Sequence, residues 1–558
     1  MKRLIFLSLG LAMTMMSWAQ VKVADYRVVC KDGSVAYFSG EDTAMEFDSE
    51  GAVLYINGQG SNKAVISYAV DGIEAIEFAE GGTYDEQYSY DGAQVDVAID
   101  AADDTSYSEV KDQVITNEDD DDYGDFFENC PVMGNVKVVY GDGIVTVTGT
   151  SGKVVTGGKP GGVLPGVMVK VSGMHVLVSS TKKDIVYTLE GSSENGSFKI
   201  MDMGEDNKRS QIVLNGLSLT NPQGPAINIQ SGKTVLVKLA DGSINKLADG
   251  ASYTPTGEDQ KGAFFSEGQL IFSGTTGSLE VKSVGGHGIV SDDYIRVRGG
   301  NITVNSVRDG INTNDRFIQS GGTVTVDAQE DGLDIGKGYI EINAGKLTVN
   351  SGDEGITASY EGDDAGNIDP LITPYIAIKG GLVKVTTTGE KGHALRAMST
   401  ITMTGGIVQA TTKGAGSKAL MSEGNMTLTG GRITAFTEGA ALYEADIKEL
   451  SSSAAIRSKG VLTIENMTVG VKSTGEGAKA INNVGNIVIR NSQVTAVASG
   501  STYQSNGLDS RSRGVTTDGN MTLSGGALKV RSYDDPLQVD GALSFENAAV
   551  YTAFKVGK

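Results

Sequence analysis

The sequence has few of the residues on which many enzyme sites and small secreted scaffolds depend. Two cysteines among 558 residues are too few for a disulfide framework, and three histidines without ligand spacing argue against a zinc enzyme. No G-x-S-x-G turn is present, which argues against a nucleophilic hydrolase. The one tryptophan, Trp18, lies close to the N-terminus. Downstream of it, a sugar ring would have to be bound by tyrosine or by charge.

The opening residues, MKRLIFLSLGLAMTMMSWAQ, combine a basic start, an apolar run and a small-residue exit. This pattern predicts a secretory signal peptide over residues 1–19, cleaved after Ala19. No cysteine follows the cleavage point, which argues against a lipoprotein anchor, and no later segment has the length and apolarity of a membrane span. We therefore expect an exported protein that is secreted, periplasmic or held at the cell surface. Cys30 and Cys130 could form one bridge or remain two thiols.

Most of the negative charge lies in one segment. The net charge is −23, and residues 85–128 contain sixteen acids and one base, Lys111. Such a run is typical of a solvated linker, and it disfavours nucleic acid as a partner. Alternating apolar and polar residues before it predict a small β module over residues 20–82. We expect an acidic linker or cap over residues 83–133, and a different organisation from residue 134 to residue 558.

This last region is repetitive. Pairs of glycines each precede an alternating strand, as in GGNITV at residue 299 and GGTVTV at residue 321. A small residue followed by Ile or Leu recurs, mostly at steps of 22–25 residues, which predicts an all-β parallel β-helix or a related solenoid. Two longer steps predict insertions at residues 359–375 and around residues 444–456. The expected apolar column consists of Ile289, Ile311, Leu333, Ile356, Leu395, Leu420, Leu442, Ile481, Leu508 and Leu537.

Acids occupy equivalent positions in three successive repeats. Asp309, Asp331 and Glu354 each precede a Gly-Ile or Gly-Leu pair, so stacking would place them roughly 5 Å apart. Unit charges at that distance repel by about 3 kcal/mol at an effective dielectric of 20. Raised pKa values, interleaved bases or a bound cation would each relieve the repulsion. Oxygen ligands favour calcium. The predicted metal set is Asp292, Asp309, Asn312, Asn314, Asp315, Asp331, Asp334, Asp353 and Glu354.

Two other interpretations of these residues remain open. Asp-Gly pairs are good turn formers without any ligand, and nearby bases could neutralise the acids instead of a metal. The bases Arg308, Arg316 and Lys337 lie beside the acids, and together with Tyr360 they are the predicted contacts for a carbohydrate.

Residues 119–361 resemble a bacterial family of carbohydrate-binding proteins that bind calcium. The resemblance rests on phrases such as YTLEGSSENGSFKI at residue 187, LNGLSLTNPQGPAINIQSGK at residue 214 and GGHGIVSDDYIRVRGGNITV at residue 285. It implies a right-handed parallel β-helix like that of pectate lyases, with calcium on the acidic positions. It also implies binding of cellulose or polygalacturonate-like chains without demonstrated cleavage. The phrases HAL, KAL and AAL at residues 393, 418 and 440 depart from the pattern of the family.

Three functions follow from these patterns. The first is a non-catalytic, calcium-dependent binder of acidic, uronate-containing plant-type polysaccharide. The second is a calcium-dependent polysaccharide lyase, which would need a base such as Lys337, Lys391 or Arg396 near the uronate C5 proton. The third is a structural or adhesive surface protein in which calcium only holds the repeats together.

Overall fold

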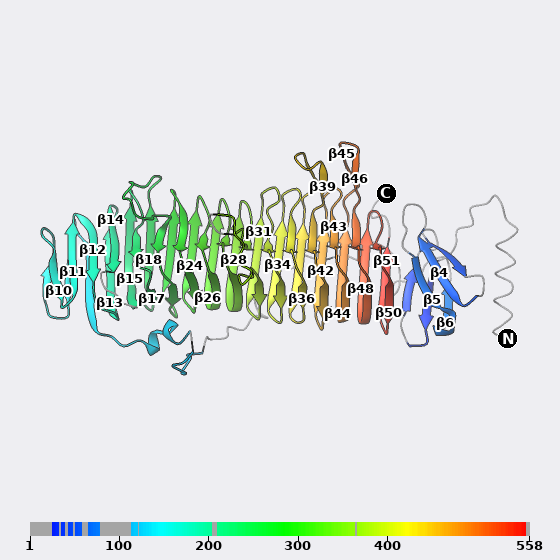
Figure 1. Ribbon diagram of the computed structural model, residues 1–558, viewed down its shortest axis with the longest axis horizontal. Helices are drawn as coiled ribbons and strands as arrows, with labels where there is room; N and C mark the ends of the chain where they lie inside the picture. The colour runs from blue at the N-terminus through cyan, green and yellow to red at the C-terminus, as the bar shows by residue number, and fades with distance from the viewer. Residues whose placement is uncertain are drawn as a thin grey trace.

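The computed structural model describes residues 25–32, 35–38, 43–47, 51–58, 65–78, 97, 113–120, 122–202, 209–362 and 365–553. The predicted signal peptide lies outside these residues. The molecule is elongated, with strands stacked side by side along its length (Figure 1). Among the described residues, the helices are three short 3-10 turns, η1 (Val70–Gly72), η2 (Tyr123–Asp125) and η3 (Phe127–Asn129). No helix of this described part is long and apolar enough to cross a membrane.

One large sheet contains 28 strands. They are β1 (Tyr26–Cys30), β2 (Val35–Phe38), β6 (Ile73–Phe78), β7 (Gly134–Gly141), β8 (Ile144–Gly149), β9 (Val154–Val155), β13 (Ile185–Ser193), β15 (Arg209–Asn221), β17 (Thr234–Leu239), β18 (Ile244–Asp249), β20 (Leu270–Ser273), β21 (Ser278–Ser283), β23 (Tyr294–Val297), β24 (Asn301–Ser306), β26 (Arg316–Ala328), β28 (Tyr339–Ser351), β30 (Ile376–Ile378), β31 (Leu382–Thr387), β33 (Ile401–Met403), β34 (Ile407–Thr412), β36 (Met426–Leu428), β37 (Arg432–Thr437), β41 (Leu462–Glu465), β42 (Thr468–Ser473), β44 (Ile487–Ala498), β48 (Met521–Ser532), β50 (Leu543–Glu546) and β51 (Ala549–Ala553).

A second sheet contains 16 strands, and three small sheets complete the fold. The second sheet is formed by β10 (Gly161–Leu164), β11 (Val167–Ser172), β12 (Met174–Ser180), β14 (Gly196–Asp202), β16 (Ile227–Gln230), β19 (Gly262–Ser266), β22 (His287–Ser291), β25 (Ile311–Thr313), β27 (Leu333–Ile335), β29 (Ile356–Ala358), β32 (Leu395–Ala397), β35 (Lys418–Ser422), β40 (Ala454–Ser458), β43 (Lys479–Asn483), β47 (Arg513–Thr517) and β49 (Leu537–Val539). The small sheets are β3 (Thr43–Phe47), β4 (Val53–Gly58) and β5 (Val65–Ala69), the hairpin β38 (Leu442–Glu444) and β39 (Glu449–Ser451), and the hairpin β45 (Tyr503–Ser505) and β46 (Leu508–Ser510).

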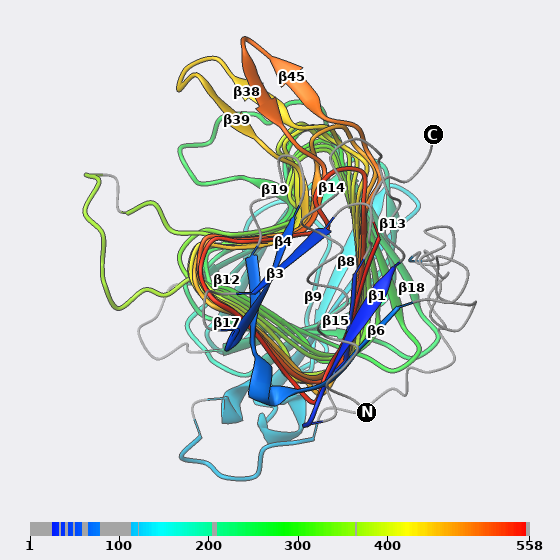
Figure 2. The same cartoon turned by 90° about the vertical axis from the view of Figure 1, so that its right-hand side faces the viewer.

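Successive repeats pair in parallel, residue for residue. In the 16-stranded sheet Ile289 pairs with Ile311, Ile311 with Leu333, and Leu333 with Ile356. These side chains are at most 1% exposed, and they belong to one apolar core that runs from Val136 to Val550. Because one repeat cannot cover its own apolar face, stacking at strand spacing is what buries this core. The end-on view shows the repeats superimposed (Figure 2).

Two members of the expected apolar column were predicted wrongly. Leu442 and Leu508 lie in the hairpins β38–β39 and β45–β46, outside the 16-stranded sheet. Ile456 and Val515 take their places, since Leu420 pairs with Ile456 and Ile481 with Val515. Each hairpin has a strand that begins with the same pattern, a small residue followed by Leu, which made these leucines indistinguishable from column positions in the sequence.

The predicted fold class is confirmed as all-β and is wrong beyond that. A right-handed parallel β-helix solenoid, preceded by a small β module and an acidic linker, does not describe the chain. Antiparallel pairs β7–β8, β8–β9, β10–β11 and β11–β12 form one end of the two large sheets. In addition, β1, β2 and β6 belong to the 28-stranded sheet itself, and β2 pairs with β51, the last strand of the chain.

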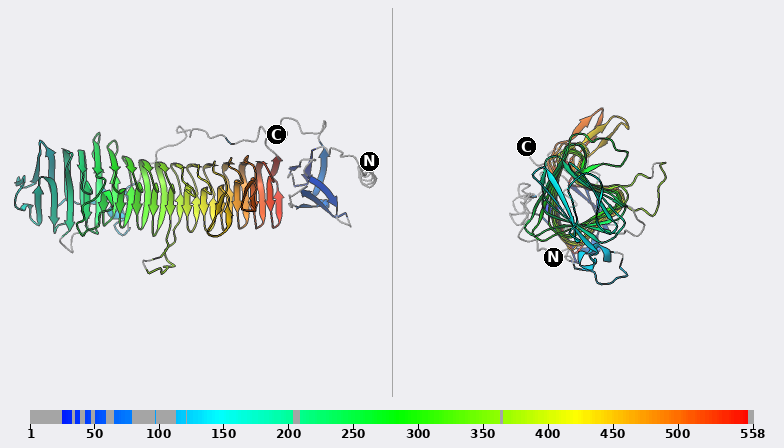
Figure 3. Two further views of the ribbon diagram at one scale, coloured as in Figure 1. Left: turned by 90° about the horizontal axis from the view of Figure 1, so that it is seen from above. Right: turned by 90° about the vertical axis from the view of Figure 1, so that its left-hand side faces the viewer.

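The N-terminal strands therefore cover the C-terminal end of the stack. The backbone N–H of Val35 donates a hydrogen bond to the carbonyl oxygen of Ala548 at 3.0 Å. Leu543 and Phe545 pack against a small core that includes Tyr26 and Leu54. Figure 3 shows this module beyond the last repeats. It blocks an end that would otherwise expose unpaired backbone groups and apolar side chains.

Part of the predicted acidic linker is packed on the large sheet. We call residues 113–120 and 122–130 the strap. Asp125 accepts a hydrogen bond from the Tyr294 hydroxyl at 2.7 Å and lies 3.1 Å from an Arg296 nitrogen. The Arg298 guanidinium lies 3.7 Å from the ring centroid of Phe126. Cys130 and Cys30 form no disulfide. The strap therefore contacts arginines for which the sequence alone indicated no partner.

The glycine between each acid and the column residue is required by packing. A Cβ on Gly310 would lie 2.1 Å from Cγ1 of Val326, and the same is true of Gly332 and Val349. The later repeats have Ala394 and Ala419 at this position. In these repeats the residue at the position of the facing valine is also alanine. In register, Ala410 and Ala435 follow Val385.

This volume match predicts the behaviour of a double substitution. Gly310→Ala should lower the free energy of unfolding by about 1–3 kcal/mol, because the added methyl group overlaps Val326. Adding Val326→Ala should recover part of that loss, since the contact at 2.1 Å is removed. Thermal unfolding in chelator measures both effects. If the double variant lost more free energy of unfolding than the two single variants together, the match would be contradicted.

Candidate functional site

The acids before the glycines lie above one another at the edge of the 16-stranded sheet. The N–H of Gly310 donates to the carbonyl oxygen of Asp331 at 2.9 Å, and the N–H of Gly332 donates to that of Glu354 at 2.9 Å. His287 and His393 continue the same column on either side, through Gly288 to Asp309 and through Gly355 to His393. Parallel pairing thus brings together carboxylates that lie 22 or more residues apart in the chain.

Two carboxylates in this column also accept a backbone hydrogen bond from the next repeat. Asp309 Oδ1 accepts from the N–H of Asp331 at 3.2 Å, and Asp331 Oδ1 accepts from the N–H of Glu354 at 2.9 Å. These bonds fix the direction of the two side chains. They leave Oδ2 of Asp331 available for another partner.

Asp309 is stabilised as a charged group. It is 7% exposed, yet Oδ2 lies 3.0 Å from His287 Nδ1 and accepts a hydrogen bond from Asn312 Nδ2 at 3.0 Å. Burial raises the pKa of Asp309, but the contacts with His287 and Asn312 outweigh it and leave the pKa lowered. The amide of Asn312 also donates to Asp334 Oδ2 at 3.1 Å. The side-chain amide of Asn312 therefore donates a hydrogen bond to each of two neighbouring carboxylates.

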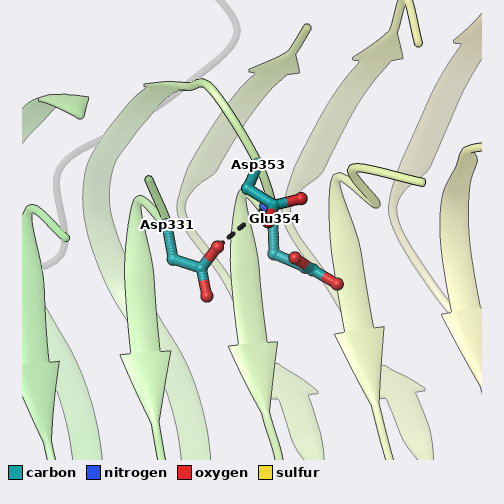
Figure 4. Close-up of side chains that lie close together, drawn as sticks. All are labelled: Asp331, Asp353 and Glu354. Carbon is teal, nitrogen blue, oxygen red and sulfur yellow. Dashed lines mark hydrogen bonds between the residues drawn. The ribbon is translucent and has the colours of Figure 1, made fainter. Parts of the chain in front are cut away.

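Asp331, Asp353 and Glu354 form the closest group of acids. One carboxylate oxygen from each lies within 4.8 Å of the other two (Figure 4). Burial, together with Glu354 and the other acids nearby, raises the pKa of Asp331 to about 9. Burial and Asp353 raise the pKa of Glu354 to about 7. We call these three residues the acidic triad; the raised pKa values of Asp331 and Glu354 reflect burial and the repulsion among neighbouring carboxylates.

Two further groups lie beside the acidic triad. Burial, followed by the charge of Asp309, raises the pKa of Asp334 to about 6. Asp334 pairs in register with Thr357, whose buried Oγ1 has no hydrogen-bond partner among the described residues. Thr357 in turn pairs with Arg396, and a nitrogen of Arg396 lies 3.5 Å from Glu354 Oε1. Arg396 is the nearest cation to the triad, at the outer limit of an ion pair.

Three of the predicted metal ligands lie at the other end of the short strands. Asp292 pairs with Lys261 at 2.6 Å, and Asn314 Nδ2 donates to the carbonyl oxygen of Asp292 at 2.9 Å. Burial raises the pKa of Asp315. These residues follow β22 and β25, whereas the acidic column precedes β25, β27 and β29. The nine predicted ligands thus divide into two separate groups.

The predicted carbohydrate contacts are mostly engaged within the protein. Arg308 pairs with Glu330 at 3.2 Å on the surface. Arg316 donates to the Tyr339 hydroxyl at 3.0 Å and lies 3.4 Å from Asp122 of the strap.

The other two predicted contacts differ in exposure. Tyr360 is 8% exposed, and its hydroxyl binds the backbone of Asn367 and Asp369 in the insertion at residues 359–375. Lys337 is exposed, and the hydrogen bond described for it is through its backbone N–H to Asn314.

The sequence interpretation missed the polar residues that continue the column beyond His393. Lys418, Lys479 and Arg513 lie in register with the acids, with Ala454 between the two lysines. Each lies two residues before a residue of the apolar column, so the register of that column would have located them. Leu420 and Ile481 were placed correctly and would have located the two lysines, whereas the misplaced Leu508 concealed Arg513.

Comparison with known proteins agrees with a carbohydrate-related role. Residues 172–499 match the model of a family described as carbohydrate-binding domain-containing protein. A relative with the same description from Acetivibrio thermocellus is 30% identical over 139 residues, which are 24% of this chain and 48% of the relative. The match therefore spans about half the length of that relative.

A solved structure is also similar to part of the chain. It is the polysaccharide lyase-like protein from C. thermocellum, as a gadolinium derivative, with 23% sequence identity. The match covers 53% of this chain and 99% of that chain at a TM-score of 0.37. A TM-score of this size supports no argument about either the fold or the chemistry.

The raised pKa of Asp331 predicts the effect of removing its charge. In the folded protein the pKa is about 9, against roughly 4 in an unfolded chain. Stability from the bound proton is therefore complete below about pH 4 and is lost as the pH rises toward 9. Asp331→Asn, which cannot ionise, should raise the melting temperature in chelator at pH 8 by about 2 °C or more and change it little at pH 4. An equal or lower melting temperature at pH 8 would contradict the assignment.

Proposed function

The chain belongs to the family of carbohydrate-binding domain-containing proteins, whose model it matches over more than half of its length, and we propose that it is an exported, non-catalytic protein that binds acidic polysaccharide through calcium. The observation that supports this proposal is the acidic triad of Asp331, Asp353 and Glu354. The carboxylate oxygens, their spacing and their negative charge all favour a divalent cation. Export is proposed from the opening residues of the sequence.

The dimensions of the acidic triad fit calcium. Calcium binds oxygen at about 2.4 Å, so two oxygens on one ion lie at most about 4.8 Å apart. The triad oxygens lie within 4.8 Å of one another. Three carboxylates offer enough charge for a dication, and carboxylate oxygens are its preferred ligands. A bound dication would also stabilise the ionised carboxylates relative to the protonated ones and so lower their raised pKa values.

The exposure of the triad suggests how a polysaccharide would reach the ion. Asp353 is exposed, while Asp331 and Glu354 are partly buried. An ion held from the protein side by these three residues would keep coordination positions toward solvent, since calcium takes six to eight ligands. The carboxylate of a uronate residue is a suitable ligand for those positions. Neutral sugars would lack that charged group, which explains the proposed preference for acidic chains.

The alternative functions gain less support from the geometry. Two of the three candidate bases for a lyase are ion-paired, Lys391 with Glu444 at 2.6 Å and Arg396 with Glu354 at 3.5 Å. A purely structural calcium site is compatible with ligands from successive repeats, because Asp331 precedes β27 and Glu354 precedes β29. Glycan binding, rather than stability, is the property that separates a structural ion from a binding ion.

Calcium-dependent glycan binding can be tested by titration calorimetry. We expect polygalacturonate to bind the full chain in calcium, at least tenfold more weakly in EDTA, and a neutral glucan to bind weakly in both. Asp331→Asn should lose the calcium-dependent part. The matched control is Glu330→Gln, which removes an exposed carboxylate next to Asp331 and should bind like the wild type. Calcium that raises the melting temperature without altering glycan binding would support the structural alternative instead.

Calcium affinity should depend on pH, because the ion must displace protons from the triad. The pKa values of Asp331 and Glu354 are about 9 and about 7 without metal. Calcium binding at pH 7 should therefore release protons, and affinity should fall as the pH falls from 9 to 5. Titrations in two buffers of different ionisation enthalpy measure the protons released. Affinity that is constant over this range would show that the ion binds elsewhere.

A further inference from the structure

The polar column changes sign after His393. Asp309, Asp331 and Glu354 precede His393, and Lys418, Lys479 and Arg513 follow it in the same register. On the other side of the apolar column, Arg396 pairs with Met421 and Met421 with Arg457. Positive groups from successive repeats thus collect on one edge of the 16-stranded sheet, directly beyond the acids.

Two inserted hairpins enclose these bases. The hairpins β38–β39 and β45–β46 project from the same face of the molecule and lie next to each other (Figures 1 and 2). Ser452, which follows β39, and Ser510 of β46 share a hydrogen bond at 2.8 Å. We call the space beneath them the hairpin pocket. Its two lobes, of about 400 Å³ and about 470 Å³, are both lined by Leu450 and Ser452.

In the part of the chain that the structure describes, the two central lysines of the hairpin pocket donate their hydrogen bonds to neutral oxygens. Lys418, which is 6% exposed, donates to the carbonyl oxygen of Gly416 at 2.7 Å and to Ser451 Oγ at 2.8 Å. Lys479 donates to Ser452 Oγ at 2.5 Å and to Ser510 Oγ at 3.3 Å. Ala454 stands between the two lysines in register, so its small side chain leaves the space between them open.

A guanidinium with no direct partner faces the same pocket. Arg457 lines the smaller lobe and makes no hydrogen bond or ion pair within the described residues, although Glu423 and Asp518 act on its charge at longer range. Two acids, Glu444 and Glu449, also line this lobe, and Glu444 is already paired with Lys391. The larger lobe is also lined by three acids: Asp535 is paired with Arg513 at 3.3 Å, Asp509 with Arg511 at 3.4 Å, and Asp540 accepts a hydrogen bond from Gln538. Among the described residues of the pocket, the unpaired positive charge therefore lies at Lys418, Arg457 and Lys479.

These cations have the composition of an anion-binding site. Burial, followed by the charge of Arg457, lowers the pKa of Lys418 to about 8. Burial, followed by the charge of Arg513, lowers the pKa of Lys479 to about 7. Like charges held together away from water are unfavourable unless an anion joins them. An anion that accepts hydrogen bonds from both an ammonium and a guanidinium group would remove this cost.

We propose that the hairpin pocket is a second carbohydrate subsite, in which Lys418, Arg457 and Lys479 bind an anionic group of the polysaccharide directly and without metal. The group is a uronate carboxylate, which matches the acidic chain of the proposed function on which this inference rests. Lys418 lies two repeats from Glu354 along one column, which corresponds to roughly 10 Å at strand spacing. A chain lying along the column would reach both the calcium site and the hairpin pocket.

The test measures binding of oligogalacturonate to the full chain in EDTA, where only the hairpin pocket should contribute. We expect weak binding in EDTA that falls at least tenfold in Lys418→Met and in Lys479→Met. The exposed, matched control Lys413→Met should leave it unchanged. Because methionine replaces a buried charge with an apolar chain of similar length, both pocket variants should melt at or above the wild-type temperature.

The outcomes separate this proposal from the calcium proposal. Wild-type protein that does not bind oligogalacturonate in EDTA, or pocket variants that bind like the wild type, would overturn the hairpin pocket as a subsite. Equal binding in calcium and EDTA, with the loss in the pocket variants retained, would overturn only the calcium site. Inorganic sulfate is the probe for a general anion site. If sulfate binds the wild type but not the two pocket variants, and oligogalacturonate does not compete with sulfate, then the pocket binds anions and the carbohydrate assignment is wrong.

Discussion

In-register stacking is the constraint on which the rest of this structure depends. Each repeat pairs with the next residue for residue, so a side chain meets its own equivalent about 5 Å away on either side. For Ile289, Ile311 and Leu333 this repetition is favourable, because like apolar groups bury one another. For a charged side chain the same repetition is unfavourable. Every polar column outside the core therefore needs a local source of opposite charge or of hydrogen bonds.

The chain meets this need in different ways along one column. Asp309 Oδ2 contacts His287 Nδ1 and accepts a hydrogen bond from Asn312, whereas the hydrogen bond described for the Asp331 carboxylate is the one from the backbone N–H of Glu354. Three arginines on the large sheet, Arg296, Arg298 and Arg316, contact the strap through Asp122, Asp125 and Phe126. Among the described residues, negative charge accumulates at the acidic triad and positive charge in the hairpin pocket. A ligand of opposite charge would lower the electrostatic cost at both places.

The sequence was sufficient for whatever repeats locally and insufficient for what packs over a distance. The glycine turns and most of the apolar column follow from spacing alone, and so does the meeting of Asp309, Asp331 and Glu354. The pairing of β2 with β51 joins residues at opposite ends of the chain, and no local pattern encodes it. Arg316 was predicted to contact a sugar because nothing near it in sequence indicated the strap. Leu442 and Leu508 show that a repeat motif cannot be told from a hairpin without the register.

The packing behind the polar column also changes where the column changes sign, but it does not stay changed. From Gly288 to Gly355 the position next to the column is glycine and the facing residue is valine, with acids outside. At Ala394 and Ala419 the inner residue is alanine, and the register gives alanine at residues 410 and 435. Beyond these, Ala435 pairs with Val471, and Gly514 next to the base Arg513 again faces a valine, Val530. The insertion at residues 359–375 falls where the column passes from acids to bases. Charge and loop length therefore divide the stack at one place, whereas the core packing is continuous across it, which is expected if the two segments differ in the groups they bind and share one fold.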